Sequence, residues 1–292
     1  MMKILKWLRI LLAAAVFCAF AAAFIGLVGA YSPAPALAKW QLVPAILALN
    51  FAALAGLALV TLLVGRVYCS VLCPLGIFQD VVLRIRSWFS KKAFVHEAPW
   101  TKTRWAVFAA CVAAALAGGF ALVALVEPYG VFGRMATALL APLAGGIRNL
   151  LVWLSERAGY SFIMKTEVFV KGGLALAVAA GSFVVIAFLA AWNGRFWCNA
   201  VCPAGTLLSA LSHRPLLRLA IDPAKCVGCG ACERVCKARC VDFKAHALDD
   251  ARCVRCFDCA AACPRKAIGF TVRSANHETH EKEDTNDTKV RG

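Results

Sequence analysis

Charged side chains are scarce in this sequence, and their scarcity limits the classes of protein that it can encode. Asp, Glu, Lys and Arg make up 16% of the 292 residues, while hydrophobic residues make up 61%. An ordinary soluble domain has about 25% charged and about 45–50% apolar residues. The composition therefore excludes a typical soluble globular protein and predicts a membrane protein.

Acidic residues are the scarcer kind of charge. There are 16 Asp and Glu against 32 Lys and Arg, which gives a formal net charge of +16. A basic excess indicates either a nucleic-acid partner or a membrane surface. Here the basic residues flank apolar stretches, as the positive-inside rule describes. We therefore expect membrane lipid as a partner, and no nucleic acid.

Motifs for several common cofactors are absent as well. The chain has no C-x-x-C-H haem-attachment motif, and no glycine-rich dinucleotide fingerprint follows a predicted strand. We therefore expect no intrinsic flavin or nicotinamide. No carboxylate or nucleophile stands out as a catalytic group, so the chemistry is expected to belong to other bound cofactors.

Long apolar stretches, by contrast, are abundant. A membrane-spanning helix needs about 20 apolar residues. Four stretches meet this requirement, and they cover residues 8–30, 42–64, 105–126 and 168–192. The first also resembles a secretory signal peptide, but its length favours an uncleaved helix.

The loops between these stretches predict the orientation. Loop 65–104 carries seven basic and two acidic residues, whereas loop 31–41 carries one basic residue. The positive-inside rule therefore places both termini and the C-terminal part in the cytoplasm, with a multi-pass chain in the plasma (inner) membrane. Segment 127–167 would lie outside. We expect it to form an amphipathic helix on the membrane interface, with a re-entrant or fifth span as the alternative.

Thirteen of the 15 cysteines lie in tight groups, and eight of them form two C-x2-C-x2-C-x3-C runs, one after the other in the chain. This spacing is typical of two-cluster ferredoxins, in which the fourth cysteine of each run ligates the other cluster. Zinc is the competing metal, but its cysteine pairs are usually well separated. One predicted [4Fe–4S] cluster is bound by Cys226, Cys229, Cys232 and Cys263. The other is bound by Cys253, Cys256, Cys259 and Cys236.

The first run departs from the usual pattern after its fourth cysteine. Lys237 stands where proline is common, and Cys240 follows four positions after Cys236. Cys240 has no counterpart in the repeat, because position 267 is alanine. We expect Cys236 to be the ligand and Cys240 to be a spare or structural thiol.

A second duplication joins residues 65–76 to residues 194–205. Both copies read G-R-x-aromatic-C-x3-C-P-x-G. Thiols at positions i and i+4 share one helix face, so two facing copies could present four ligands for an additional metal or redox site. The alternative is packing, with each proline starting a helix at its favoured position. The four cysteines are Cys69, Cys73, Cys198 and Cys202.

These features predict a mainly α membrane protein with four transmembrane helices in two repeated pairs, plus a small α+β ferredoxin-like domain with two [4Fe–4S] clusters. The membrane domain would cover residues 1–219 and the ferredoxin-like domain residues 220–273. Residues 274–292 are polar and lack core-forming side chains, so we expect a disordered tail.

Together, the spans, the two C-x3-C-P turns and the double cysteine run resemble the ferredoxin-type membrane subunits of the NapH and NosR kind. The resemblance implies a quinol dehydrogenase-like subunit that passes electrons between the quinone pool and a redox partner or reductase complex. Two other functions stay open. One is a copper-handling or maturation factor that uses the C-x3-C-P thiols, and the other is a redox-sensing regulator.

Overall fold

The structure is a computed structural model, and it describes residues 2–26, 34–90, 93–158 and 171–272. Most of these residues are helical, and the strands lie only in the C-terminal part. The helices that precede the first strand are α1 (Met2–Phe24), α2 (Ala34–Ala38), α3 (Leu42–Leu47), α4 (Phe51–Val64), α5 (Tyr68–Val71), α6 (Pro74–Phe89), α7 (Thr101–Leu116), α8 (Phe120–Val126), α9 (Pro128–Met135), the π-helical turn η1 (Ala136–Leu140), α10 (Ala141–Arg157), α11 (Gly173–Asn193), the π-helical turn η2 (Trp197–Val201) and α12 (Pro203–Leu211).

Three helices of the described part are long and apolar enough to cross a membrane. They are α1, the continuous helix Pro128–Arg157, and α11. Helices α1 and α11 match two of the predicted spans, and α4 is a shorter apolar helix. The helices support a membrane protein, but the predicted count of four spans is not confirmed.

Two predicted spans are not single helices. Stretch 42–64 divides into α3 and α4 at Leu49, whose φ of 50° is left-handed, and the Asn50 side chain then caps α4 by accepting the Ala53 amide at 3.2 Å. Stretch 105–126 divides into α7 and α8 at Gly118, whose φ is 78°. Hydropathy alone did not reveal these breaks, because the residues that make them are themselves apolar or small.

Segment 127–167 contains a helix, as expected, and its length and apolar composition match the alternative of a further span. Pro128–Arg157 forms one helical stretch, and it begins where the Glu127 carboxylate accepts the Tyr129 and Gly130 amides. The turn η1 ends at Leu140, two residues before Pro142, and a π-helical turn can accommodate the ring and the missing amide of a proline inside a helix. Pro142 therefore does not end the helix. The last part of the predicted segment, residues 159–167, lies outside the described residues.

The cysteine-rich part is a small α+β unit. It contains β1 (Leu217–Ile221), α13 (Ala231–Arg234), β2 (Val241–Asp242), β3 (Ala247–Leu248), α14 (Asp258–Ala262) and β4 (Ile268–Val272). β1 pairs antiparallel with β4, so that Leu217 faces Val272, and β2 pairs antiparallel with β3. β1 spans the domain boundary predicted at 219/220. The predicted tail lies outside the described residues.

The backbone of this unit repeats with the same period as its cysteines. Three pairs of residues that are 27 positions apart all have positive φ, which tightens the turns within and directly after the two cysteine runs. These pairs are Gly228 with Arg255, Gly230 with Phe257, and Arg239 with Lys266.

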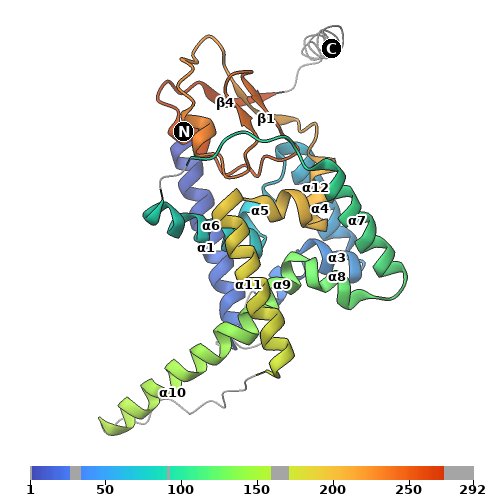
Figure 1. Cartoon of the computed structure of the whole chain (residues 1–292), viewed down its shortest axis with the longest axis vertical. Coiled ribbons are helices and arrows are strands. Elements are labelled where there is room, and N and C mark those ends of the chain that lie inside the picture. Colours follow the sequence, from blue (N-terminus) through green and yellow to red (C-terminus); the bar gives the residue numbers. More distant parts are fainter. Residues whose placement is uncertain (1, 27–33, 91–92, 159–170, 273–292) are drawn as a thin grey trace.

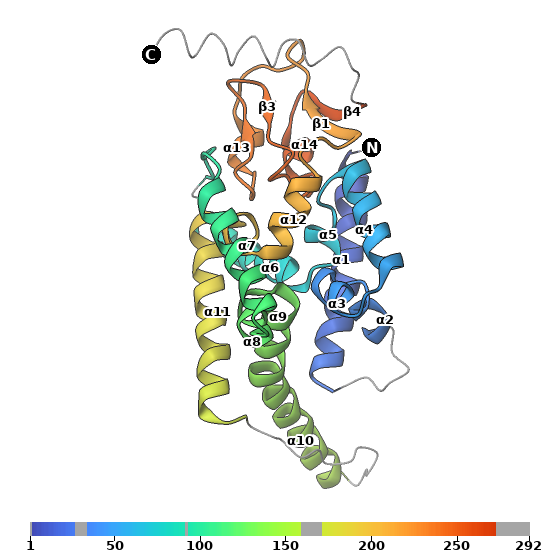
Figure 2. The same ribbon diagram turned by 90° about the vertical axis from the view of Figure 1, so that its right-hand side faces the viewer.

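The small unit lies at one end of the molecule, and α10 extends at the opposite end (Figures 1 and 2). The start of α1 lies beside the small unit, where Lys6 forms an ion pair with Asp258 of α14 at 2.8 Å. α4 and α11 also end near it. The two C-x3-C-P turns follow these helices, so they lie between the long helices and the small unit.

Candidate metal centres

The two cysteine runs form two separate groups, and each run supplies its fourth cysteine to the other group. One cavity is lined by Cys226, Cys229, Cys232 and Cys263. A second cavity is lined by Cys236, Cys253, Cys256 and Cys259, together with Cys240. The sequence-predicted ligand sets are thus the sets that the fold brings together, while their role as ligands stays a prediction.

The surroundings of both groups fit iron–sulfur clusters. Among the described residues that line the two cavities, no acidic residue or histidine competes with the cysteines, and the rest are mainly apolar. Burial raises the pKa of Cys256 to about 12 in the absence of a bound group. Metal binding would supply the charge that stabilises such a buried thiolate.

Cys240 makes the second group a set of five thiols. The amide of Cys240 donates to the Cys236 Sγ at 3.4 Å, as the amide of Ala267 donates to the Cys263 Sγ at 3.3 Å. The Cys240 side chain also lies against this group, with its sulfur 3.5 Å from that of Cys236. A hydrogen bond from the Cys240 thiol lowers the pKa of Cys253 to about 7. Cys236 therefore occupies the position that the repeat assigns to a ligand, and Cys240 is an additional hydrogen-bond donor to this group.

The two C-x3-C-P turns face each other below the small unit. Their four thiols are 3–5% exposed. Cys73 and Cys202 cap α6 and α12, accepting the Gly76 amide at 3.4 Å and the Gly205 amide at 3.3 Å. Pro74 and Pro203 occupy the first position of these helices, as expected. Packing and ligand presentation are thus compatible, because the prolines shape the turns while the sulfurs gather between them.

The arginine of each C-x3-C-P motif donates a hydrogen bond to the backbone of the other motif. The Arg66 Nη2 donates to the Cys198 carbonyl at 3.0 Å, and the Arg195 Nη1 donates to the Cys69 carbonyl at 2.5 Å. Both arginines are completely buried. Gly76 and Gly205 lie against these two carbonyl groups, and a Cβ at either position would overlap the oxygen that accepts from the arginine. The exchange of arginines makes the two motifs one structural unit.

The small unit is fixed to this pair of turns by charges. Asp80 of α6 forms ion pairs with Arg195 at 2.7 Å, with Arg9 at 3.0 Å and with Lys237 at 3.4 Å. Lys237 also pairs with Asp258 at 2.9 Å. The residue that replaces the usual proline therefore connects the cysteine-rich unit to the membrane helices.

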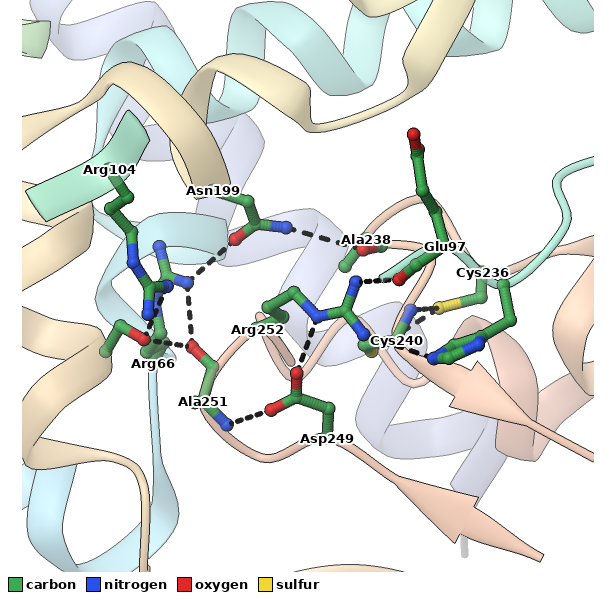
Figure 3. A network of polar contacts seen from close by, with 12 residues as sticks. Arg66, Glu97, Arg104, Asn199, Cys236, Ala238, Cys240, Asp249, Ala251 and Arg252 are labelled. Carbon is green, nitrogen blue, oxygen red and sulfur yellow. Dashed lines mark hydrogen bonds and ion pairs between the residues drawn. The ribbon is translucent and has the colours of Figure 1, made fainter. Parts of the chain in front are cut away.

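A second set of contacts uses the loop between α6 and α7 (Figure 3). Arg252 donates to the Glu97 carbonyl and to the Asp249 carboxylate, both at 2.5 Å. Arg66 reaches into the small unit and donates to the Ala251 carbonyl at 3.0 Å, and to the Asn199 side chain at 2.8 Å. The turns and the cysteine-rich unit therefore share one polar network.

The cysteine groups also approach one another through the apolar core. Cys69, Cys73 and Cys202 belong to the core of the helical part, and Cys256 packs against that core. Cys229, from the other cavity, is exposed at the surface. The cysteines thus form a series from the membrane helices to the surface of the small unit. Across the described residues, no three His, Cys, Asp or Glu side chains converge closely enough for a single metal ion.

Sequence reasoning missed the residues that connect the parts, namely Asp80, Lys237, Arg66 and Arg195. The two arginines had a detectable signal, because both copies of the repeated motif contain an arginine at the same position. Lys237 stood out only as a departure from the usual proline, and Asp80 had no signal. The ion pair between them joins segments that are distant in the chain.

The fold and the cysteine groups define a ferredoxin-type iron–sulfur protein with membrane helices. Comparison with known families supports this class. A family described as "4Fe-4S binding domain" matches residues 46–93 and again residues 173–220, and each match contains one C-x3-C-P turn. A second family with the same description matches residues 219–242, which contain the first ferredoxin run.

Two curated proteins resemble the chain. The methylamine utilization ferredoxin-type protein MauN of Methylobacillus flagellatus is 26% identical over 204 residues, covering 68% of this chain and 55% of MauN. An uncharacterized protein of Methanocaldococcus jannaschii is 43% identical over 54 residues, covering 18% of this chain and 21% of that protein. The chain thus spans about half of the length of one relative and a fifth of the other. No solved structure matches the chain.

Proposed function

We propose that this protein relays electrons one at a time between the membrane quinone pool and a redox partner, through two [4Fe–4S] clusters in its ferredoxin-like unit. The observation that carries the proposal is the position of Cys256. Cys256 lines the cavity of the second cysteine group, which we call the inner group, and the group around Cys226 is the outer group. Cys256 also packs on the core that contains three of the C-x3-C-P cysteines. Iron–sulfur clusters supply one-electron transfer when they are bound.

The residues around the cysteines support a relay with a membrane end and a soluble end. The inner group, around Cys256, faces the membrane helices, while the outer group includes the exposed Cys229. The packing of Cys256 on the helical core favours transfer along this series, and the exposed end is available to a soluble partner. The ion pairs of Asp80 with Lys237 and Arg195 attach the inner group to the helices.

The charge distribution supports a cytoplasmic location for the ferredoxin-like unit in the inner membrane. The start of α1, with Lys3 and Lys6, and the start of α7, with Lys102 and Arg104, both lie at its end of the molecule (Figure 2). The positive-inside rule assigns such a face to the cytoplasm. The quinone would then meet the chain at the bilayer edge, near the C-x3-C-P turns.

A second function, copper handling, is favoured by the C-x3-C-P thiols alone, because soft thiolates select Cu(I). All four cysteines are 3–5% exposed beneath the small unit, whereas copper delivery needs a route by which each ion enters and leaves during function. Electron transfer needs no such route. The burial therefore favours the relay over copper delivery.

The proposal is tested by adding a quinol to the anaerobically purified, oxidised protein in detergent and following the visible absorbance of its clusters. We expect each quinol to lose two electrons and two protons as the absorbance decreases, in steps of one electron for each cluster. A Cys256→Ser variant should lose most of this response, whereas Cys111→Ser, outside all the cysteine groups, should keep it. Clusters that respond to dithionite but never to quinol would contradict the quinone link.

A further inference from the structure

We propose that the two C-x3-C-P turns together hold a third iron–sulfur cluster, bound by Cys69, Cys73, Cys198 and Cys202. The inference deepens the proposed function and rests on it, because the cluster would be the step between the bilayer edge and the inner ferredoxin site. Four cysteines are the usual ligand set of a protein-bound iron–sulfur cluster.

The four thiols are close together although they come from two turns that are distant in the chain. Cys69, Cys73 and Cys202 belong to one buried core cluster, and the Cys198 sulfur lies 3.3 Å from Gln79 of α6, the helix that Cys73 caps. All four cysteines are free and buried. The reciprocal contacts of Arg66 and Arg195 hold the two turns face to face.

Every one of the four sulfurs accepts one N–H group. The Gly76 and Gly205 amides donate to Cys73 and Cys202. The other two donors are side chains: Gln79 Nε2 donates to the Cys198 Sγ at 3.3 Å, and Arg66 Nη2 lies 3.7 Å from the Cys69 Sγ. Hydrogen bonds of this kind stabilise cluster sulfurs and set the reduction potential. The contacts of Gln79 and Arg66 are not helix caps, so capping does not account for them.

One of the two buried positive charges at this site has no anionic partner among the described residues. Arg66 is completely buried, and no carboxylate in the described part of the chain pairs with it. Its Nε has no hydrogen-bond partner either. Arg195 has one carboxylate, Asp80, which it shares with Arg9 and Lys237. A buried charge is costly unless it is paired, and an anionic four-thiolate cluster would provide the pairing for Arg66.

Iron–sulfur chemistry fits this position better than a single zinc or copper ion. Zinc carries no electron. The four cysteines of a cluster bind different iron atoms, so they need not converge on one point. The core that holds three of these cysteines contacts Cys256 of the inner ferredoxin site. A quinol would release two protons to water and pass its two electrons singly through this centre, becoming a quinone.

The test compares the iron and sulfide content of three anaerobically purified proteins, together with their low-temperature EPR spectra. They are the natural chain, the Cys69→Ser/Cys198→Ser variant and a Cys18→Ser/Cys111→Ser control. We expect the natural chain and the control to contain more than the roughly eight irons of two clusters. The Cys69/Cys198 variant should fall to that level, with the ferredoxin signals intact as proof that it folds.

Equal iron in all three proteins would overturn the third cluster and leave the ferredoxin relay unaffected. Zinc or copper lost in place of iron would overturn it as well. A fourth protein, Arg66→Gln, tests the charge argument. It should lower the midpoint potential of the third centre alone, and an unchanged potential would contradict the role of Arg66.

Discussion

Two residues distinguish the two halves of the ferredoxin repeat. Lys237 follows the fourth cysteine of the first run, and its ammonium group joins Asp80 to Asp258. Cys240 occupies the place of Ala267, and its thiol lies 3.5 Å from the Cys236 sulfur. The departures from the repeat therefore have separate roles: Lys237 connects the cysteine-rich unit to the helices, and Cys240 adds a donor to the inner group.

Replacing Cys236 and Cys240 in turn tests which of them is the ligand. We expect Cys236→Ala to lose the EPR signal of the inner cluster and about four irons. Cys240→Ala should keep the iron and shift the potential, since the Cys240 amide still donates to Cys236. Loss of the cluster in Cys240→Ala alone would reverse the assignment.

Glycines of the C-x3-C-P turns offer a second test on the same scale. A Cβ at Gly76 or Gly205 would overlap the carbonyl oxygen of Cys69 or Cys198. We expect Gly76→Ala to destabilise the fold by about 1–3 kcal/mol, seen as a lower unfolding temperature in detergent. Gly181→Ala in α11 is the matched control, because nothing lies within 4 Å of its added Cβ. Equal unfolding temperatures for both variants would argue against close packing of the turns.

The role of a single residue could be predicted where it follows from neighbouring positions in the sequence. The cysteine groups could be predicted, because C-x2-C-x2-C-x3-C spacing is itself the geometry of the site. The exchange of Arg66 and Arg195 could not, since it depends on the packing of two turns that are distant in the chain. A sequence repeat shows that two segments have similar local structure, but it does not predict that they contact each other.

At the scale of elements, α6 has the central position. It packs against α1, α9 and α11, and it carries Asp80 toward the small unit. Burial by itself would raise the pKa of Asp80, but the charges of Arg195, Lys237 and Arg9 outweigh burial and hold the pKa well below its usual range. Asp80 is therefore ionised in the folded protein at any physiological pH.

Asp80→Asn should weaken the attachment of the small unit. Removing one partner of a buried ion pair costs about 3–5 kcal/mol, because the remaining cations are left unpaired. The matched control is Asp222→Asn, whose exposed pair with Lys225 should contribute nothing measurable. Limited proteolysis and unfolding temperature measure the difference. Equal behaviour of the two variants would contradict a connecting role for Asp80.

The same carboxylate predicts a pH dependence. A depressed folded-state pKa stabilises the protein fully above the unfolded value, which is about 4 for aspartate, and this contribution is lost as the pH falls further. We expect the stability difference between the natural chain and Asp80→Asn to be constant from pH 8 to about pH 5, and to shrink below about pH 4 in unfolding experiments. If the stability difference between the two proteins already shrinks between pH 8 and pH 6, the pH dependence arises from a group other than Asp80.

Elements were predictable where the pattern is long and uniform. α1 and α11 agree with the apolar stretches, but the stretches at 42–64 and 105–126 are broken by a left-handed Leu49 and by Gly118. Pro142, by contrast, does not interrupt its helix, since η1 precedes it and the helix continues. In each of these segments the local backbone conformation determines whether the helix continues, and a hydropathy profile contains no information on that conformation.

At the scale of the whole molecule, the order of the parts explains the proposed activity. The long helices lie on one side of the molecule and the small unit on the other (Figure 2). Cys256 of the inner cysteine group packs on the core that contains three C-x3-C-P cysteines, and the outer group includes the exposed Cys229. Only the parts themselves could be predicted from the sequence, because their order depends on ion pairs between residues that are distant in the chain. Those contacts are also what makes the ferredoxin-like unit part of the membrane protein.

The account depends most directly on the two clusters of the ferredoxin-like unit. The measurement is an iron and sulfide count with low-temperature EPR on the dithionite-reduced Cys69→Ser/Cys198→Ser variant, purified anaerobically, in which only these two sites remain. The account predicts about eight irons per chain and the spectrum of two magnetically coupled [4Fe–4S] clusters. Four irons or fewer, with stoichiometric zinc in their place, would contradict it.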